Sequence, residues 1–173
     1  MGIRLARAAA GTGRVDEALR ILRKIAADEG RPGADDPRRF ARLHAAAYLA
    51  AMLAESDTPK ASIAAELRRL QLFDAPTTWT LLTWHDLDAQ LVLARTDEVA
   101  VDSVAAGDTG LFALQGSGDA PTVVRHAGAD HGRTVAYRRI VIAFDGRNFD
   151  VTVEPGSIGP STGTPEVLAG TAP

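Results

Sequence analysis

The stretch TTWTLLTWHDLDAQLVLA, residues 77–94, separates two kinds of sequence pattern. It contains both tryptophans, Trp79 and Trp84, and is rich in the β-branched and aromatic residues that favour strands. Before it, apolar residues recur at helical spacing, and after it short apolar runs alternate with turn residues. The stretch therefore predicts the point at which a helical part ends and a strand part begins.

Four short amphipathic helices are predicted upstream, over residues 1–75. Gly11-Thr12-Gly13 ends the first helix. Asp35-Asp36-Pro37 and Ser56-Asp57-Thr58-Pro59 each combine a capping side chain with a proline, which is typical of a helix start. Tight turns between such helices indicate an array of helical hairpins.

The segment AAAGTGRVDEAL, residues 8–19, resembles the turn and second-helix start of a tetratricopeptide-type repeat. In such repeats a first helix of small residues turns at glycine into an acidic segment with a buried alanine. The resemblance covers about one repeat, lacks the large aromatic residues of the first helix, and is not followed by a period of about 34 residues. Gly11-Thr12-Gly13 is interpreted as a hairpin turn rather than a phosphate loop, because no strand precedes it and no Gly-Lys-Ser/Thr or GxGxxG pattern is present.

Residues 76–156 predict six to eight short strands, enough for a small antiparallel β-sandwich. The clearest hairpin spans residues 138–153, with Asp145-Gly146 as its two-residue loop. That loop would place Ile142 opposite Phe149 and Ile140 opposite Val151. One face of the hairpin would then be apolar, and the other face would carry Asn148, Asp150 and Thr152 in contact with water.

Residues 157–173 are rich in Gly, Ser, Thr and Pro and are predicted to form a flexible tail. Docking of Val167-Leu168 on the sandwich is the less favoured alternative. The predicted fold is α+β: an N-terminal helical-hairpin array over residues 1–75, an antiparallel β-sandwich over residues 76–156, and the tail.

The segment LTWHDLDAQL, residues 82–91, resembles the opening of a poorly characterised β-sandwich domain found at the C-termini of bacterial proteins. Those proteins often carry tetratricopeptide-like helices, or vault/inter-alpha-trypsin (VIT) and von Willebrand A domains, upstream. Trp84 and Asp88 match the opening, whereas Gln90 stands at its second acidic position. The resemblance covers about residues 77–156. It implies a non-enzymatic interaction module that forms the C-terminal part of a larger, envelope-associated bacterial protein.

Composition excludes several classes of function. The formal charge of −3 argues against a general nucleic-acid binder. The absence of cysteine excludes disulfides, thiolate catalysis and cysteine zinc sites. No apolar run reaches the length of about 20 residues that a membrane-spanning helix needs, and arginines interrupt the region of a secretory signal. Compartment, partner and oligomeric state stay open.

Five residues are candidate contacts to a ligand or partner: Trp79, Trp84, His85, Asp86 and Asp88. The tryptophans are five apart and lie on opposite faces of one strand, so one indole is expected in the core and the other is available as a stacking platform. His85, Asp86 and Asp88 are interpreted as a turn in which aspartates cap backbone amides, with a site for a hard cation as the alternative.

His126, Asp130 and His131 have the side chains of a transition-metal site, but two histidines five apart on a loop are common without a metal. His44 is interpreted as a packed or surface histidine. No catalytic residue, cofactor or metal is therefore predicted. The favoured function is a protein-interaction or scaffold module without enzyme activity. The alternative is a sandwich that binds carbohydrate or another ligand on an exposed tryptophan, and a metal-dependent hydrolase is the least favoured reading.

Overall fold

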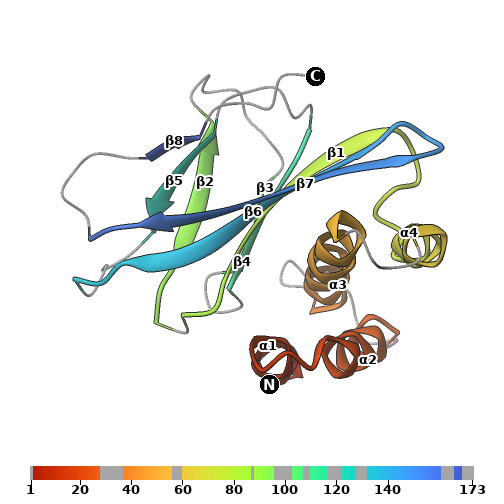
Figure 1. Cartoon of the computed structure of the whole chain (residues 1–173), viewed down its shortest axis with the longest axis horizontal. Coiled ribbons are helices and arrows are strands. Elements are labelled where there is room, and N and C mark those ends of the chain that lie inside the picture. Colours follow the sequence, from red (N-terminus) through yellow and green to blue (C-terminus); the bar gives the residue numbers. More distant parts are fainter. Residues whose placement is uncertain are drawn as a thin grey trace. The chain divides into compact units, whose positions relative to one another are not determined.

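The computed structural model describes residues 2–27, 37–55, 60–86, 88–95, 103–106, 110–116, 122–127, 132–160 and 166–168. The chain divides into two compact units, residues 1–74 and residues 75–173. The first is built from helices and the second from antiparallel strands, so the predicted α+β fold is confirmed (Figure 1). Among the described residues, no helix is long and apolar enough to cross a membrane.

Helices of the first unit pack in chain order, each against the next. They are α1 (Gly2–Gly11), α2 (Val15–Ala26), α3 (Pro37–Ala54) and α4 (Lys60–Arg69). The predicted turn after α1 is confirmed: the amide of Arg14 donates to the carbonyl of Ala9 at 2.9 Å, and Gly13 has a φ of 80°. The two cap-plus-proline signals lie in part outside the described residues, which resume at Pro37 and at Lys60.

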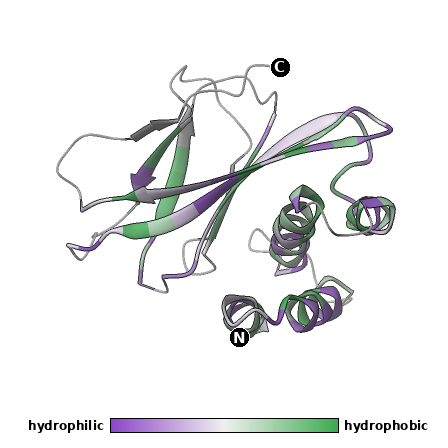
Figure 2. Ribbon diagram, viewed as in Figure 1, coloured by the Kyte–Doolittle hydropathy of each residue, from purple (hydrophilic) through white to green (hydrophobic). Residues whose placement is uncertain are grey.

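Alanine brings the helices of this unit together. Most of α3 is hydrophobic (Figure 2), and its buried residues include five alanines. A methyl side chain occupies little space, so neighbouring helices approach α3 closely and bury its surface on more than one side. In α2, by contrast, Leu19 and Leu22 are buried while Arg23 and Lys24 carry charge in the last turn, where they complement the helix dipole.

Two sheets form the second unit. Their strands are β1 (Thr77–Trp84), β2 (Leu91–Arg95), β3 (Ser103–Ala106), β4 (Leu111–Gln115), β5 (Thr122–His126), β6 (Val135–Phe144), β7 (Phe149–Ile158) and β8 (Glu166–Leu168). One sheet has the order β3-β4-β1-β6-β7 and the other the order β2-β5-β8, and every pairing is antiparallel.

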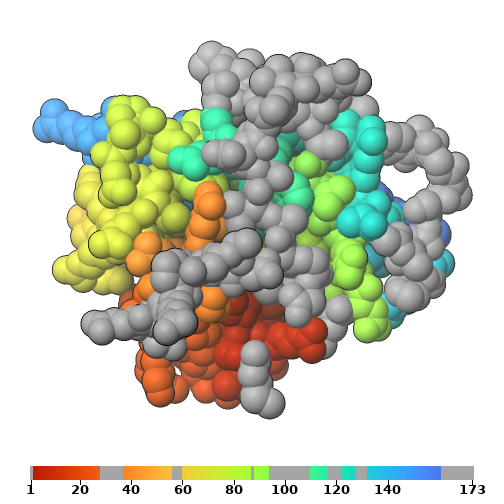
Figure 3. Space-filling view, turned by 180° about the vertical axis from the view of Figure 1, so that it is seen from behind, coloured from red at the N-terminus to blue at the C-terminus, as the bar shows by residue number. Residues whose placement is uncertain are grey.

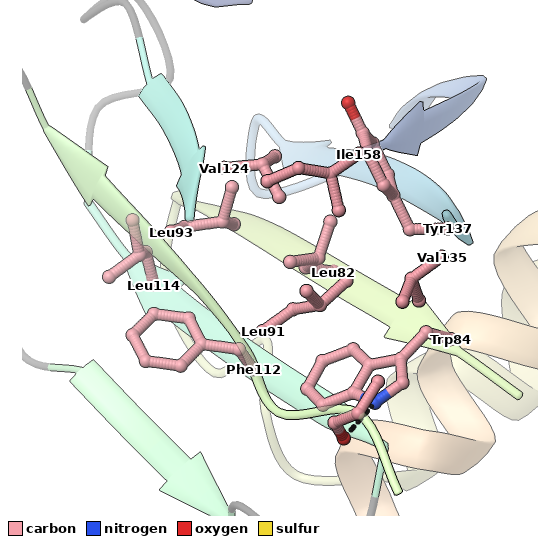
Figure 4. Packing of buried hydrophobic residues seen from close by; sticks show 11 residues of the cluster. Leu82, Trp84, Leu91, Leu93, Phe112, Leu114, Val124, Val135, Tyr137 and Ile158 are labelled. Atoms are coloured by element: carbon pink, nitrogen blue, oxygen red, sulfur yellow. Dashed lines mark hydrogen bonds between the residues drawn. The ribbon is translucent and has the colours of Figure 1, made fainter. Parts of the chain in front are cut away.

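The sandwich core lies between these sheets (Figure 4). Trp84 lies in it with its indole Nε1 donating to the carbonyl of Ala89 at 2.8 Å. Both sheets contribute buried side chains that contact each other, and each large one adds about 1.5–3 kcal/mol to stability. The core residues are Leu82, Trp84, Ala89, Leu91, Leu93, Phe112, Leu114, Val124, Val135, Tyr137 and Ile158.

The β6–β7 hairpin is present, but its predicted register is wrong by two residues. Phe144 pairs with Phe149, and Ile142 pairs with Val151. The two central loop residues are Gly146, with a φ of 97°, and Arg147, because the Asp145 amide already donates to the Asn148 carbonyl at 3.2 Å. A shift of two keeps every side chain on its predicted face, since side chains alternate with a period of two.

The expectation of one wet face is wrong for β6. Ile140 and Ile142 are buried on one face, and Arg139 and Val141 are buried on the other. Arg139 pairs with Leu82 of the sandwich core, so its face of the sheet is an interior one. On β7 the same face has an exposed Asp150 at one end, whereas Ile158 at the other end belongs to the sandwich core.

β7 forms a border of the five-stranded sheet and contains Pro155, opposite Arg138. Along an antiparallel ladder, directly opposite residues alternate between pairs that exchange backbone hydrogen bonds and pairs that do not. The hydrogen bond between Asp145 and Asn148 identifies the bonded pairs, and counting from it makes Arg138 and Pro155 a non-bonded pair. The nitrogen of Pro155 therefore points away from β6, towards the free border. Proline has no N–H to offer there, and border strands are where sheets tolerate it.

The prediction of a flexible tail over residues 157–173 is wrong in two places. Ser157 and Ile158 belong to β7, and Glu166–Leu168 form β8, which pairs with β5. The physical reason is that Val167 and Leu168, the only adjacent apolar pair of this segment, can extend a sheet whose border strand β5 is otherwise unpaired on that side.

Candidate functional site

Both tryptophans of the candidate set are buried. Trp79 and Trp84 lie on opposite faces of β1, as their spacing predicts, and each is 2% exposed. Trp84 belongs to the sandwich core, whereas Trp79 lies on the other face of the sheet, directly opposite Ile142. Neither indole is therefore available as an exposed stacking platform.

The turn after β1 places Asp86 and Asp88 near Arg133, and His85 in the same turn is exposed. Oδ1 of Asp86 accepts the amide of Asp88 at 2.9 Å, so this aspartate caps the backbone. Nη2 of Arg133 lies 3.6 Å from Asp86 Oδ2 and 3.3 Å from Asp88 Oδ2, so both carboxylates already have a cationic partner. The interpretation as a capped turn fits this geometry.

Of the three side chains of the possible transition-metal site, the structure describes His126. Nε2 of His126 donates to the carbonyl of Gly159 at 3.0 Å, while Asp130 and His131 lie outside the described residues. His44 is 2% exposed within α3, with its ring centroid 6.4 Å from that of Tyr48. In the part of the chain that the structure describes, no group of three metal-ligating side chains occurs.

The helical unit contains a groove that the sequence did not predict. It encloses about 460 Å³ and is open to solvent. Three successive helices and the turn after α4 line it, with Leu22, Arg23, Ala26, Ala27, Arg42, Ala45, Glu66, Arg69, Leu70 and Gln71. From the side opposite to Figure 1, residues of α3 (orange) lie between those of α4 (yellow) and those of α1 and α2 (red) (Figure 3).

Glu66 joins two walls of this groove. Its Oε2 accepts from Arg23 of α2 at 2.8 Å, and its Oε1 accepts from Arg69 of α4 at 2.7 Å. The pair with Arg23 links residues 43 positions apart, so it holds α2 and α4 on either side of α3. Both arginines are more than half exposed, so each pair adds less than about 1 kcal/mol to stability.

Arg42 of α3 lies in the same groove and is half-buried. Among the described residues no hydrogen bond or ion pair to its guanidinium is found, because the only carboxylate of the lining, Glu66, is held by Arg23 and Arg69. Ala26 and Leu70 are half-buried and form an apolar floor, above Leu22 and Ala45, which are 0% and 2% exposed. The groove thus combines an apolar floor with a cation that has no partner among the described residues.

The spacing of residues within each helix predicts part of the groove. Arg42 and Ala45 are three apart, as are Glu66 and Arg69, and residues three apart share one face of a helix. Which faces of α2, α3 and α4 meet at the groove depends on tertiary packing, and no local pattern in the sequence indicates it. The chain matches no protein-family model, no curated protein and no solved structure.

Proposed function

We propose that this chain is a non-enzymatic protein-interaction module and that the groove between α2, α3 and α4 is its docking surface. The observation that carries the proposal is the open groove of about 460 Å³ with half-buried Ala26 and Leu70 on its floor. Beside them lies Arg42, which has no partner in the part of the chain that the structure describes. Binding sites combine apolar concave surface with a few polar groups that orient the ligand.

The side chains of the groove favour binding over chemistry. Its described lining includes no histidine, serine or tyrosine, and its single carboxylate accepts from two arginines. Both oxygens of this carboxylate are therefore already occupied by ion pairs. The alternative of carbohydrate binding on an exposed tryptophan gains no support, since both indoles are 2% exposed.

Site-specific photocrosslinking tests the proposal in the cells that naturally produce the protein. A benzophenone amino acid replaces Ala27, an exposed residue of the groove, and in a control variant it replaces Arg20, an exposed residue of α2 outside the groove. We expect a discrete crosslinked partner from position 27 alone. The substitution Ala26→Phe, which fills the groove, should abolish that crosslink while the circular dichroism spectrum stays unchanged.

Two results would contradict the proposal. One is the same crosslinked products from both positions, which would indicate random collision. The other is a crosslink at position 27 that persists after Ala26→Phe, since a partner that ignores the filled groove does not dock in it.

A further inference from the structure

The groove of the helical unit carries a positive excess. Three guanidiniums, those of Arg23, Arg42 and Arg69, face the single carboxylate of Glu66, which leaves a net charge of +2 on the described lining. The helical unit as a whole has 13 Arg and Lys against 10 Asp and Glu, a difference of +3, although the complete chain is at −3. The described lining of the groove is therefore basic, in a chain that is acidic overall.

Arg42 is the cation best placed to contact a bound anion. Arg23 and Arg69 already donate to Glu66 at 2.8 and 2.7 Å, whereas Arg42 has no such partner in the described part of the chain. Its half-buried position lowers the local dielectric constant, which strengthens an ionic hydrogen bond relative to one in bulk water. A guanidinium also matches the two oxygens of a carboxylate with two parallel donors.

The apolar floor indicates that a ligand of the groove also carries an apolar group. Ala26 and Leu70 are half-buried and present aliphatic surface within the same groove. A simple inorganic anion would leave this surface in water, and a nucleic-acid strand would bring phosphates close to the carboxylate of Glu66. A peptide that carries acidic residues beside an apolar side chain would cover the floor and satisfy Arg42 at once.

We infer that the groove binds an acidic peptide segment of a partner protein, with one carboxylate on Arg42 and a neighbouring aliphatic or aromatic side chain on the floor formed by Ala26 and Leu70. This inference rests on the proposed docking function and names the chemistry of its ligand. Complementary charge sets orientation and association rate, and the buried apolar contact sets the lifetime of the complex.

Selection from a phage library of random dodecapeptides on the immobilised full chain tests the inference. Bound phage are first depleted on the Arg42→Glu variant, so that only peptides dependent on this residue remain. We expect enriched peptides to be net negative and to contain a Leu, Ile, Phe or Trp beside an Asp or Glu. By isothermal titration, Arg42→Gln should weaken an enriched peptide about tenfold to a hundredfold, the range for loss of a hydrogen bond to a charged group.

The matched control is Arg20→Gln, which removes an exposed arginine of the neighbouring helix outside the groove and should leave the affinity unchanged. Arg42→Lys keeps the charge without the two parallel donors and should give an intermediate affinity. Raising the salt concentration should weaken binding of the wild type more than that of Arg42→Gln.

Enrichment of neutral or basic peptides would overturn the inference, as would equal affinities of Arg42→Gln and the wild type. Displacement of the enriched peptide by a single-stranded oligonucleotide would overturn it too, by indicating phosphate as the ligand. The photocrosslinking experiment separates this inference from the proposed docking function. If a groove-specific crosslink persists in the Arg42→Glu variant, the docking function holds but the ligand is not acidic. If no groove-specific crosslink forms at all, both proposals are wrong.

Discussion

Arg139 and Glu154 face each other across β6 and β7, where Nη1 of the arginine donates to Oε2 of the glutamate at 2.8 Å. The arginine side chain is 1% exposed and the glutamate side chain 40%. Nε and Nη2 of Arg139 have no hydrogen-bond partner in the described part of the chain, so Glu154 is the acceptor that compensates for burial of the charge.

We expect Glu154→Ala to lower the free energy of unfolding by about 1–3 kcal/mol, because it leaves a buried guanidinium without an acceptor. Arg139→Met removes the buried charge itself and should change the free energy by less than about 1 kcal/mol in either direction. Urea unfolding of the two variants makes the comparison. A larger loss for Arg139→Met than for Glu154→Ala would contradict this account.

Gly156 lies beneath the ring of Tyr137, its direct partner on β6. A Cβ at position 156 would lie 2.4 Å from Cζ of that ring, so Gly156→Ala requires the ring or the strand to move. We expect a loss of about 1–3 kcal/mol in stability. Gly159→Ala is the matched control, because nothing lies within 4 Å of its added Cβ. Equal melting temperatures for the two variants would contradict the prediction.

Asp145 gives the hairpin an acid-dependent contribution to stability. Hydrogen bonds from the backbone amide of Asn148 and then from that of Arg147 hold the pKa of its carboxyl below the ordinary value. Because the folded pKa is the lower one, the contribution is complete above the unfolded pKa of about 3.9 and is lost as the pH falls through the folded pKa.

The Asp145→Asn variant lacks this titrating group. The difference in unfolding free energy between wild type and variant should therefore be constant near neutral pH and shrink below about pH 4. Guanidinium unfolding at a series of pH values measures it. A difference that grows as the pH falls would have the wrong sign for a depressed pKa.

The indole of Trp84 combines core packing with one polar contact. Trp84→Phe keeps an aromatic ring but deletes the donor to the Ala89 carbonyl at 2.8 Å, which then lies buried without that partner. We expect a loss of about 1–3 kcal/mol. Thermal unfolding followed by circular dichroism tests this, and a variant as stable as the wild type would show that the carbonyl finds another donor.

Local patterns predicted most of the fold. The helices of the first unit and the strands that contain Trp79 and Ile140 follow from apolar spacing, because that spacing sets which face of an element is buried. The hairpin register was missed by two residues since Asp145 binds the amides of Arg147 and Asn148, a side-chain effect that moves the turn one residue along the chain.

The groove could not be predicted because it depends on contacts between distant residues. Arg23 and Glu66 are 43 positions apart and meet only once α2 and α4 have both packed beside α3. Sequence reasoning instead selected Trp79 and Trp84, for which an indole in a strand is consistent with either a core or a surface. Their neighbours in the sheet decide between the two, and the partners Ile142 and Tyr137 belong to a strand far along the chain.

Pro155 protects the protein against aggregation through the border strand β7. The outward row of amide hydrogens on β7 is interrupted where the proline nitrogen lies, so a foreign strand aligned with that row would lose a bond near its middle and have to bend around the pyrrolidine ring. Replacement by threonine would restore a continuous row of donors and open a path to fibril growth during synthesis and storage.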